Sequence, residues 1–130
     1  MAKAAANGIA IEYETFGSPA ARPLLLIGGL ADQLIHWDEE LCRDLSARGH
    51  YVIRFDNRDA GLSTKFDQEG VPDLGALARG EEGTPYTLED MDDDAVGLLD
   101  ALDIRKGHIC GASMGGMIAQ TIAIPPPSRL

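Results

Sequence analysis

The amino-acid sequence predicts an α/β fold with a mainly parallel sheet flanked by helices. Three short, largely apolar runs have the length of strands, at 24–29, 51–56 and 107–110. Helical patterns separate them. The run 24–29 is continuously apolar, which is typical of a strand buried on both faces of a parallel sheet, and the other two are expected as further buried strands. Glycines and polar residues follow the runs, at the sheet edge where α/β proteins build their sites.

The first expected strand spans residues 8–17 and differs from the other three. Ile9, Ile11 and Tyr13 alternate there with small or charged residues, which is the period-2 pattern of a half-buried strand. The segment Ser18–Pro23 then ends it, because each proline removes a backbone donor and fixes its own torsion. We therefore expect an opening strand that lies outside the parallel part of the sheet.

A helix is expected between the first two apolar runs, within residues 36–50. Trp37, Leu41 and Leu45 recur at fourfold spacing, which would place them on one apolar face. Gly49 is a typical residue to end such a helix. The strand at 51–56 follows directly.

Residues 57–85 are rich in Gly, Asp and Pro and predict a long loop with a short helical turn near 74–78. A second long helix follows, with Thr87 as its N-cap and Asp90 completing a weaker form of the capping box. Its expected apolar stripe consists of Leu88, Met91, Ala95, Leu98, Leu99 and Leu102.

The composition excludes several classes of protein. With 45% hydrophobic and 25% charged residues the chain is a typical globular domain, and its net charge of -10 disfavours nucleic acid and anionic membranes as partners. The acidic run Glu89–Ala95 predicts a solvated helix face or carboxylates near a helix N-terminus. A metal site there is a weaker hypothesis, because neighbouring aspartates on a helix point in different directions. We expect no metal and no cofactor.

Two cysteines, Cys42 and Cys110, are too few and too distant to predict a disulfide framework or a zinc site. Both are expected as reduced thiols in apolar surroundings. The first eight residues contain one lysine and no long apolar segment, so they do not resemble a signal peptide. A cytoplasmic location is the expectation.

The third apolar run ends in the pattern Gly-x-Ser-x-Gly, at Gly111, Ser113 and Gly115. A helix follows it and must end before Pro125. In a sharp turn between strand and helix, the Ser113 hydroxyl would be exposed above the sheet as a nucleophile, with glycines allowing close backbone approach. The alternative is that Gly-Ala-Ser only allows tight packing of strand against helix.

Two backbone N–H groups are candidates for an oxyanion hole at this turn. The Met114 N–H begins the helix, and a second donor is expected from the loop after an earlier strand. Gly28 and Gly29 open such a loop and make the Leu30 N–H the candidate, although two glycines also fit a plain turn. A phosphate-binding loop is disfavoured, because no lysine follows Gly111.

Four stretches together resemble the N-terminal part of an α/β-hydrolase fold enzyme: 24–32, 52–64, 108–124 and 127–130. The chain is most similar to bacterial esterases of the aclacinomycin methylesterase type. Many relatives have His-Gly where this chain has Gly28 and Gly29. The resemblance implies that 108–124 is the nucleophile elbow with its helix, and that Asp56 and Arg58 organise a loop as structural residues.

No Asp, Glu or His follows Ser113, although in this fold the triad runs serine, acid, histidine. His36, His50 and His108 all precede it and have plainer roles. Residues 1–130 are therefore expected to be the N-terminal portion of an α/β-hydrolase domain, lacking the cap and C-terminal strands. Alone they should be weak or inactive, and we expect a complementary fragment or self-association.

The expected function is a serine-type carboxylic ester hydrolase acting on a small-molecule ester. Other reactions on the same fold stay open: carbon–carbon bond hydrolysis, perhydrolysis and acyl transfer. Relatives that open epoxides or carbon–halogen bonds typically have aspartate at the elbow, so Ser113 argues against those. A non-catalytic interaction module is the third class.

Overall fold

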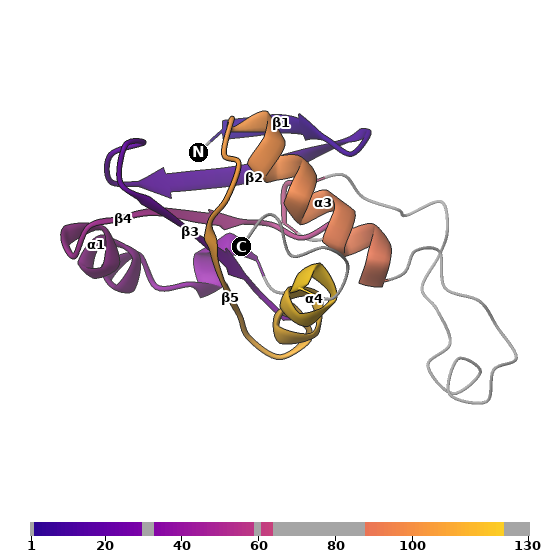
Figure 1. Ribbon diagram of the computed structural model, residues 1–130. Coiled ribbons are helices and arrows are strands. Elements are labelled where there is room, and N and C mark those ends of the chain that lie inside the picture. The colour runs from indigo at the N-terminus through magenta and orange to yellow at the C-terminus, as the bar shows by residue number, and fades with distance from the viewer. Residues whose placement is uncertain (1, 30–32, 59–60, 64–87, 124–130) are drawn as a thin grey trace, which may run out of the picture.

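Five strands form one sheet in the order β1-β2-β4-β3-β5, and helices lie on both of its faces (Figure 1). The structure is a computed structural model that describes residues 2–29, 33–58, 61–63 and 88–123. Most of the predicted loop at 57–85, including its helical turn, and the N-cap Thr87 lie outside the described residues. The α/β class predicted from the sequence is confirmed.

The sheet is mixed, and its parallel part is built from the three apolar runs. β3 (Arg22–Ile27) lies between β4 (His50–Phe55) and β5 (His108–Gly111), and both pairings are parallel. β2 (Ile9–Phe16) joins β4 in antiparallel register. The carboxyl ends of β3, β4 and β5 therefore meet at one edge of the sheet.

The outermost strand, β1 (Ala2–Ala6), was not predicted. It pairs antiparallel with β2 through a two-residue turn in which Asn7 has φ 51° and Gly8 has φ 79°. Positive φ at both positions is typical of the tight hairpin turns that favour Asn-Gly. The Asn-Gly pair was thus the available signal, while the alanine-rich strand itself has little β propensity.

The prediction that residues 107–110 form a strand buried on both faces is wrong. Residues along β5 alternate between exposed and half-buried, with His108 and Cys110 exposed. The cause is that α1 (Glu39–Ala47), on that face of the sheet, packs mainly on β4 and β2. Cys110 is therefore not in the apolar surroundings expected for it.

The helix α1 begins where Asp38 caps it, since the Asp38 side chain accepts a hydrogen bond of 3.0 Å from the Glu40 N–H. Its expected apolar face is confirmed in part, because Trp37 and Leu45 are half-buried and pack toward the sheet. Leu41 is the exception at 43% exposed, and Cys42 beside it is fully buried. Trp37 precedes α1 and follows the short 3-10 helix η1 (Leu34–His36).

A small apolar cluster joins α1 to its side of the sheet. Cys42 packs there with three buried side chains of the strands, and this burial raises the pKa of its thiol. The prediction of a reduced thiol in apolar surroundings therefore fits Cys42. The buried members of the cluster are Phe16, Leu26, Cys42 and Val52.

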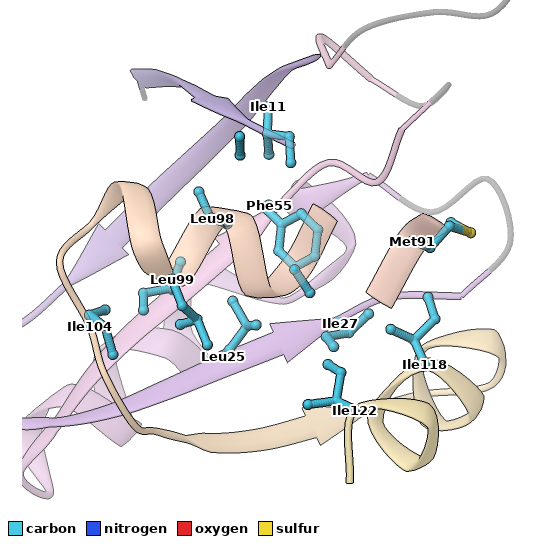
Figure 2. Close-up of a cluster of buried hydrophobic side chains, with 13 residues drawn as sticks. Ile11, Leu25, Ile27, Phe55, Met91, Leu98, Leu99, Ile104, Ile118 and Ile122 are labelled. Atoms are coloured by element: carbon cyan, nitrogen blue, oxygen red, sulfur yellow. The ribbon is translucent and has the colours of Figure 1, made fainter. Parts of the chain in front are cut away.

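The main core lies on the opposite face of the sheet, beneath α3 (Leu88–Ala101) and α4 (Met114–Ala123) (Figure 2). Alternate strand residues such as Leu25 and Ile27 point into it, and α3 contributes most of the predicted stripe. The buried side chains from that stripe are Met91, Ala95, Leu98 and Leu99. Burying a side chain as large as Leu or Met is worth about 1.5–3 kcal/mol.

The acidic run of α3 contains a buried ion pair that the sequence did not predict. Asp94 is only 2% exposed and accepts two hydrogen bonds from the Arg58 guanidinium, at 2.5 and 2.8 Å. Asn7 Nδ2 donates to the same carboxylate at 3.0 Å. This carboxylate thus ties α3 to the end of β4 and to the β1–β2 turn.

Two findings concern metal binding and membrane-spanning helices. Within the described ranges, no group of three or more His, Cys, Asp or Glu side chains is arranged to hold a metal ion. No helix in the same ranges has the length and apolarity to cross a bilayer.

The ion pair predicts a contrast between neighbouring aspartates. Asp94→Ala removes the carboxylate that faces the buried Arg58 guanidinium, and the free energy of unfolding should fall by about 3–5 kcal/mol. Asp93→Ala, at an exposed position on the same helix, should change it by less than about 0.5 kcal/mol. Urea unfolding of both variants measures this, and equal losses would contradict a stabilising role specific to Asp94.

Candidate functional site

The candidate site lies where β3, β4 and β5 end. Gly28 and Gly29 follow β3, residues 56–58 follow β4, and Ala112 and Ser113 follow β5. Because β3 lies between the other two strands, its glycines lie between the polar residues after β4 and the serine after β5. The parallel pairing therefore brings together three segments that are far apart in the sequence.

Ser113 occupies a strained turn between β5 and α4. Its φ of 55° lies in the left-handed region, which residues other than glycine seldom adopt, and the residue is exposed. Strain of this kind persists only where the surrounding structure enforces it, and it gathers at functional sites. Here the Ala112 N–H donates to the Ile27 carbonyl at 3.0 Å, and the Gly116 N–H donates to the Ser113 carbonyl at 2.9 Å.

The two glycines of the serine motif are required by close backbone contact. A Cβ atom on Gly111 would collide with the Gly115 carbonyl, and one on Gly115 would collide with the carbonyls of Ile27 and Gly28. Gly116 is different, since a Cβ there would lie 3.6 Å from the Gly111 oxygen, an ordinary contact. The same turn thus packs the strand tightly against the helix and holds Ser113 in a strained conformation.

Only part of the predicted oxyanion hole can be described. Met114 is the first residue of α4, so its N–H has no acceptor in a preceding helical turn and lies at the positive end of the helix dipole. Leu30, the second predicted donor, lies outside the described residues. Gly28 and Gly29, which precede it, are buried.

The segment that begins at Gly28 is held by two consecutive side chains at the end of β4. Asn57 Nδ2 donates to the Gly28 carbonyl at 3.1 Å and to the Gly29 carbonyl at 3.5 Å. Asp56 Oδ1 accepts from the Leu34 N–H at 2.6 Å. Sequence reasoning missed Asn57, although a polar residue directly after a buried strand at this edge was an available signal.

Asp56 makes the loop contacts that the family resemblance implied, whereas the hydrogen bonds described for Arg58 go to Asp94 of α3. The second carboxylate oxygen of Asp56 accepts a hydrogen bond from the Leu62 N–H at 2.8 Å. The main-chain carbonyl of Asp56 accepts one from Ser63 Oγ at 2.6 Å. Ser63 Oγ also accepts from the Glu12 N–H at 2.9 Å. Asp56 thus holds the segment 61–63 against the sheet, while Arg58 faces Asp94.

Comparison with known proteins agrees with this arrangement. A model of the alpha/beta hydrolase fold family matches residues 22–130, which include all three strand ends and the serine turn. The chain belongs to the α/β hydrolase fold family. Rhodomycin D methylesterase from a Streptomyces species is 38% identical over 117 residues, or 90% of this chain and 35% of that protein.

Other α/β hydrolases extend the comparison to lactone chemistry and to solved structures. The 3-oxoadipate enol-lactonase 2 of Acinetobacter baylyi is 30% identical over 95% of this chain and 40% of its own length. The crystal structure of an enol-lactonase from Burkholderia xenovorans superimposes with a TM-score of 0.79 at 28% identity, covering 99% of this chain and 44% of that one. The chain therefore spans less than half the length of these relatives.

Two of the three histidines lie at the other end of the parallel strands from Ser113, and the third takes part in a helix cap. His50 and His108 are the first residues of β4 and β5, so they lie at the amino ends of these strands, whereas Ser113 follows the carboxyl end of β5. Their rings contact one another edge to face, with centroids 6.3 Å apart. His36 Nδ1 accepts from the Gln33 N–H at 3.1 Å, as part of the cap of η1.

The turn predicts opposite effects at adjacent glycines. Gly115→Ala forces a methyl group against the Ile27 carbonyl, so the free energy of unfolding should fall by about 3 kcal/mol or more. Gly116→Ala has room and should raise it by up to about 1 kcal/mol, because alanine favours a helix. Thermal unfolding of both variants checks this, and a tolerated Gly115→Ala would contradict the close contact.

Proposed function

We propose that Ser113 is the nucleophile of a carboxylic ester hydrolase. The observation that carries the proposal is the left-handed, exposed backbone of Ser113 at the turn from β5 to α4. Such a turn presents a hydroxyl above the sheet beside the N-terminus of a helix. The relatives named as a methylesterase and an enol-lactonase support ester chemistry.

In the proposed reaction, Ser113 Oγ attacks the carbonyl carbon of the ester while a general base takes its proton. The carbonyl electrons move to oxygen, and the Met114 and Leu30 N–H groups stabilise this anion. When the tetrahedral intermediate collapses, the alcohol leaves with the proton and the acyl group stays on Ser113. Water then attacks the acyl-enzyme in the same way and releases the acid.

The acid and the general base of this mechanism are proposed to come from polypeptide outside residues 1–130. No Asp, Glu or His follows Ser113 in the sequence, and the three histidines that precede it are committed elsewhere or lie at the opposite sheet edge. Within the described ranges, β5 pairs only with β3, so its other edge can accept a further strand. A complementary segment or a second copy of the chain is the proposed partner.

Nucleophile chemistry is tested with a short-chain chromogenic ester, with imidazole in solution supplying a general base. The imidazole-dependent rate of the wild type should exceed that of Ser113→Ala by about tenfold or more. Ser46→Ala, which removes a hydroxyl on α1, serves as the matched control and should retain the wild-type rate. Equal rates for the wild type and Ser113→Ala would contradict the nucleophile role of Ser113 and favour a non-catalytic interaction module.

The proposed partner predicts an assembly. Light scattering combined with intact-mass measurement should give a particle heavier than one copy of residues 1–130, because the edge of β5 that has no neighbouring strand among the described residues favours strand addition. The mass of the components tells a second copy from a bound fragment. A compact, well-behaved monomer would contradict this part of the proposal.

A further inference from the structure

We propose that the site at Ser113 selects esters that carry a positive charge over esters that carry a carboxylate. The proposal rests on the proposed function, because it names a substrate class for that reaction. It follows from the edge of the sheet at which the chain places its acidic and its basic side chains. No direct contact between a carboxylate and the substrate is assigned, because the effect is that of an electrostatic potential around the site.

The N-terminal half of α3 lies at the same edge of the sheet as Ser113. Asp94 in that half binds Arg58, which comes three residues after the end of β4. Met91 belongs to the same core cluster as Ile118, in the first half of α4, and the two helices pack against one another (Figure 2). Because α4 begins directly after Ser113, the acidic part of α3 is on the side of the serine turn.

This part of α3 has an excess of negative charge. Residues 90–94 include four aspartates, and Asp93 is exposed. Arg58 adds one positive charge, so three negative charges are left in balance. Lys3, another exposed cation, lies on β1, the strand farthest from β5 in the sheet.

The helix on the other face of the sheet also begins with acidic residues at this edge. The Trp37 carbonyl accepts a hydrogen bond from Arg54, next to the last residue of β4, which places the start of α1 there. Residues 38–40 are Asp-Glu-Glu and are exposed, and Arg43 pairs with Glu39. Carboxylates are stabilised at the positive end of a helix dipole, which explains why both helices carry them at this end.

Four exposed cations lie at the opposite edge. Arg22 is the first residue of β3, Arg48 comes two residues before β4, and Arg105 and Lys106 come just before β5. The amino ends of parallel strands share one edge, away from Ser113. Exposed aspartates toward the C-terminal ends of α1 and α3 offset part of this positive charge. The described part of the chain therefore has its negative end at the serine turn.

Such a potential acts on a substrate in proportion to the charge of that substrate. At low ionic strength it raises the local concentration of a cationic ester near Ser113 and lowers that of an anionic one. The Debye length is about 30 Å at 0.01 M salt, about 8 Å at 0.15 M and about 3 Å at 1 M. The selection should therefore be strong in dilute buffer and vanish at high salt.

The first test measures the potential at position 113 without catalysis. Ser113→Cys, combined with Cys110→Ser, is modified with methanethiosulfonates that carry either a trimethylammonium or a sulfonate group; Cys42 is buried. The charge ratio is the rate constant of the cationic reagent divided by that of the anionic one, relative to a neutral free thiol. It should be about tenfold or more at about 0.01 M salt and fall to about 1 at about 1 M. The thiolate fraction cancels, because both reagents react with the same thiol.

Ala47→Cys, also with Cys110→Ser, is the matched control for position. Ala47 is exposed at the end of α1, next to Arg48 and at the amino ends of the strands. Its charge ratio should be about 1 or lower in dilute buffer. A charge ratio for Ser113→Cys that equals that of Ala47→Cys overturns the proposal.

Paired substitutions test which carboxylates cause the potential. Asp90→Asn with Asp93→Asn should lower the charge ratio of Ser113→Cys by about threefold in dilute buffer. Asp44→Asn with Asp100→Asn removes the same net charge toward the other ends of α1 and α3 and should lower it by less than about 1.5-fold. Equal changes in both pairs contradict the assignment to the acidic part of α3.

The imidazole-supported assay then tests the substrate class on the unmodified chain. Three chromogenic esters differ only in an acyl group that ends in trimethylammonium, its uncharged tert-butyl isostere or a carboxylate. In dilute buffer, the Ser113-dependent kcat/KM should decrease in that order, by about tenfold or more from first to last, and the three values should converge at high salt. Equal values in dilute buffer overturn the proposal. Failure of the proposed function appears differently, as equal rates for the wild type and Ser113→Ala, while the charge ratios do not depend on it.

Discussion

The site depends on one backbone contact, the approach of the turn after β5 to the last residue of β3. The Ile27 carbonyl accepts the Ala112 N–H, and the same carbonyl lies so close to Gly115 that no side chain fits between them. This contact fixes how α4 leaves the sheet, and therefore fixes the left-handed backbone of Ser113. Because the contact joins two backbones, its geometry does not depend on flexible side chains.

Parallel strands explain why such a contact can organise several segments at once. β3 is the central strand of the parallel part, so whatever follows it is neighboured by the ends of both β4 and β5. The residues after β4 supply hydrogen-bonding side chains, while those after β5 supply a backbone turn and a hydroxyl. This difference follows from the local sequence, because polar residues come after β4 and small residues come after β5.

Sequence patterns predicted the parts of the molecule that are governed by burial and by backbone sterics. The apolar runs located β3 and β4, and the spacing of Met91, Leu98 and Leu99 gave the buried face of α3. The glycine–serine pattern located the turn, since few sequences fit a strained residue between close backbones. Failures came where the packing of a neighbouring element decides the outcome. The helix α1 packs mainly on β4 and β2, which leaves one face of β5 exposed among the described residues, and it turns Cys42 rather than Leu41 toward the sheet. Side-chain bonds such as Asn57 to Gly28 carry no periodic signal.

Each side chain of the tripeptide Asp56–Arg58 holds a different element of the structure. Its three side chains are an acceptor, a neutral donor and a cation, and they serve η1, the loop after β3, and α3 respectively. Inserting or deleting one residue after Phe55 would therefore exchange all three with the wrong partners at the same time. Insertions and deletions should therefore not be tolerated in this short stretch, because its length decides which side chain reaches which of the segments that meet above the sheet.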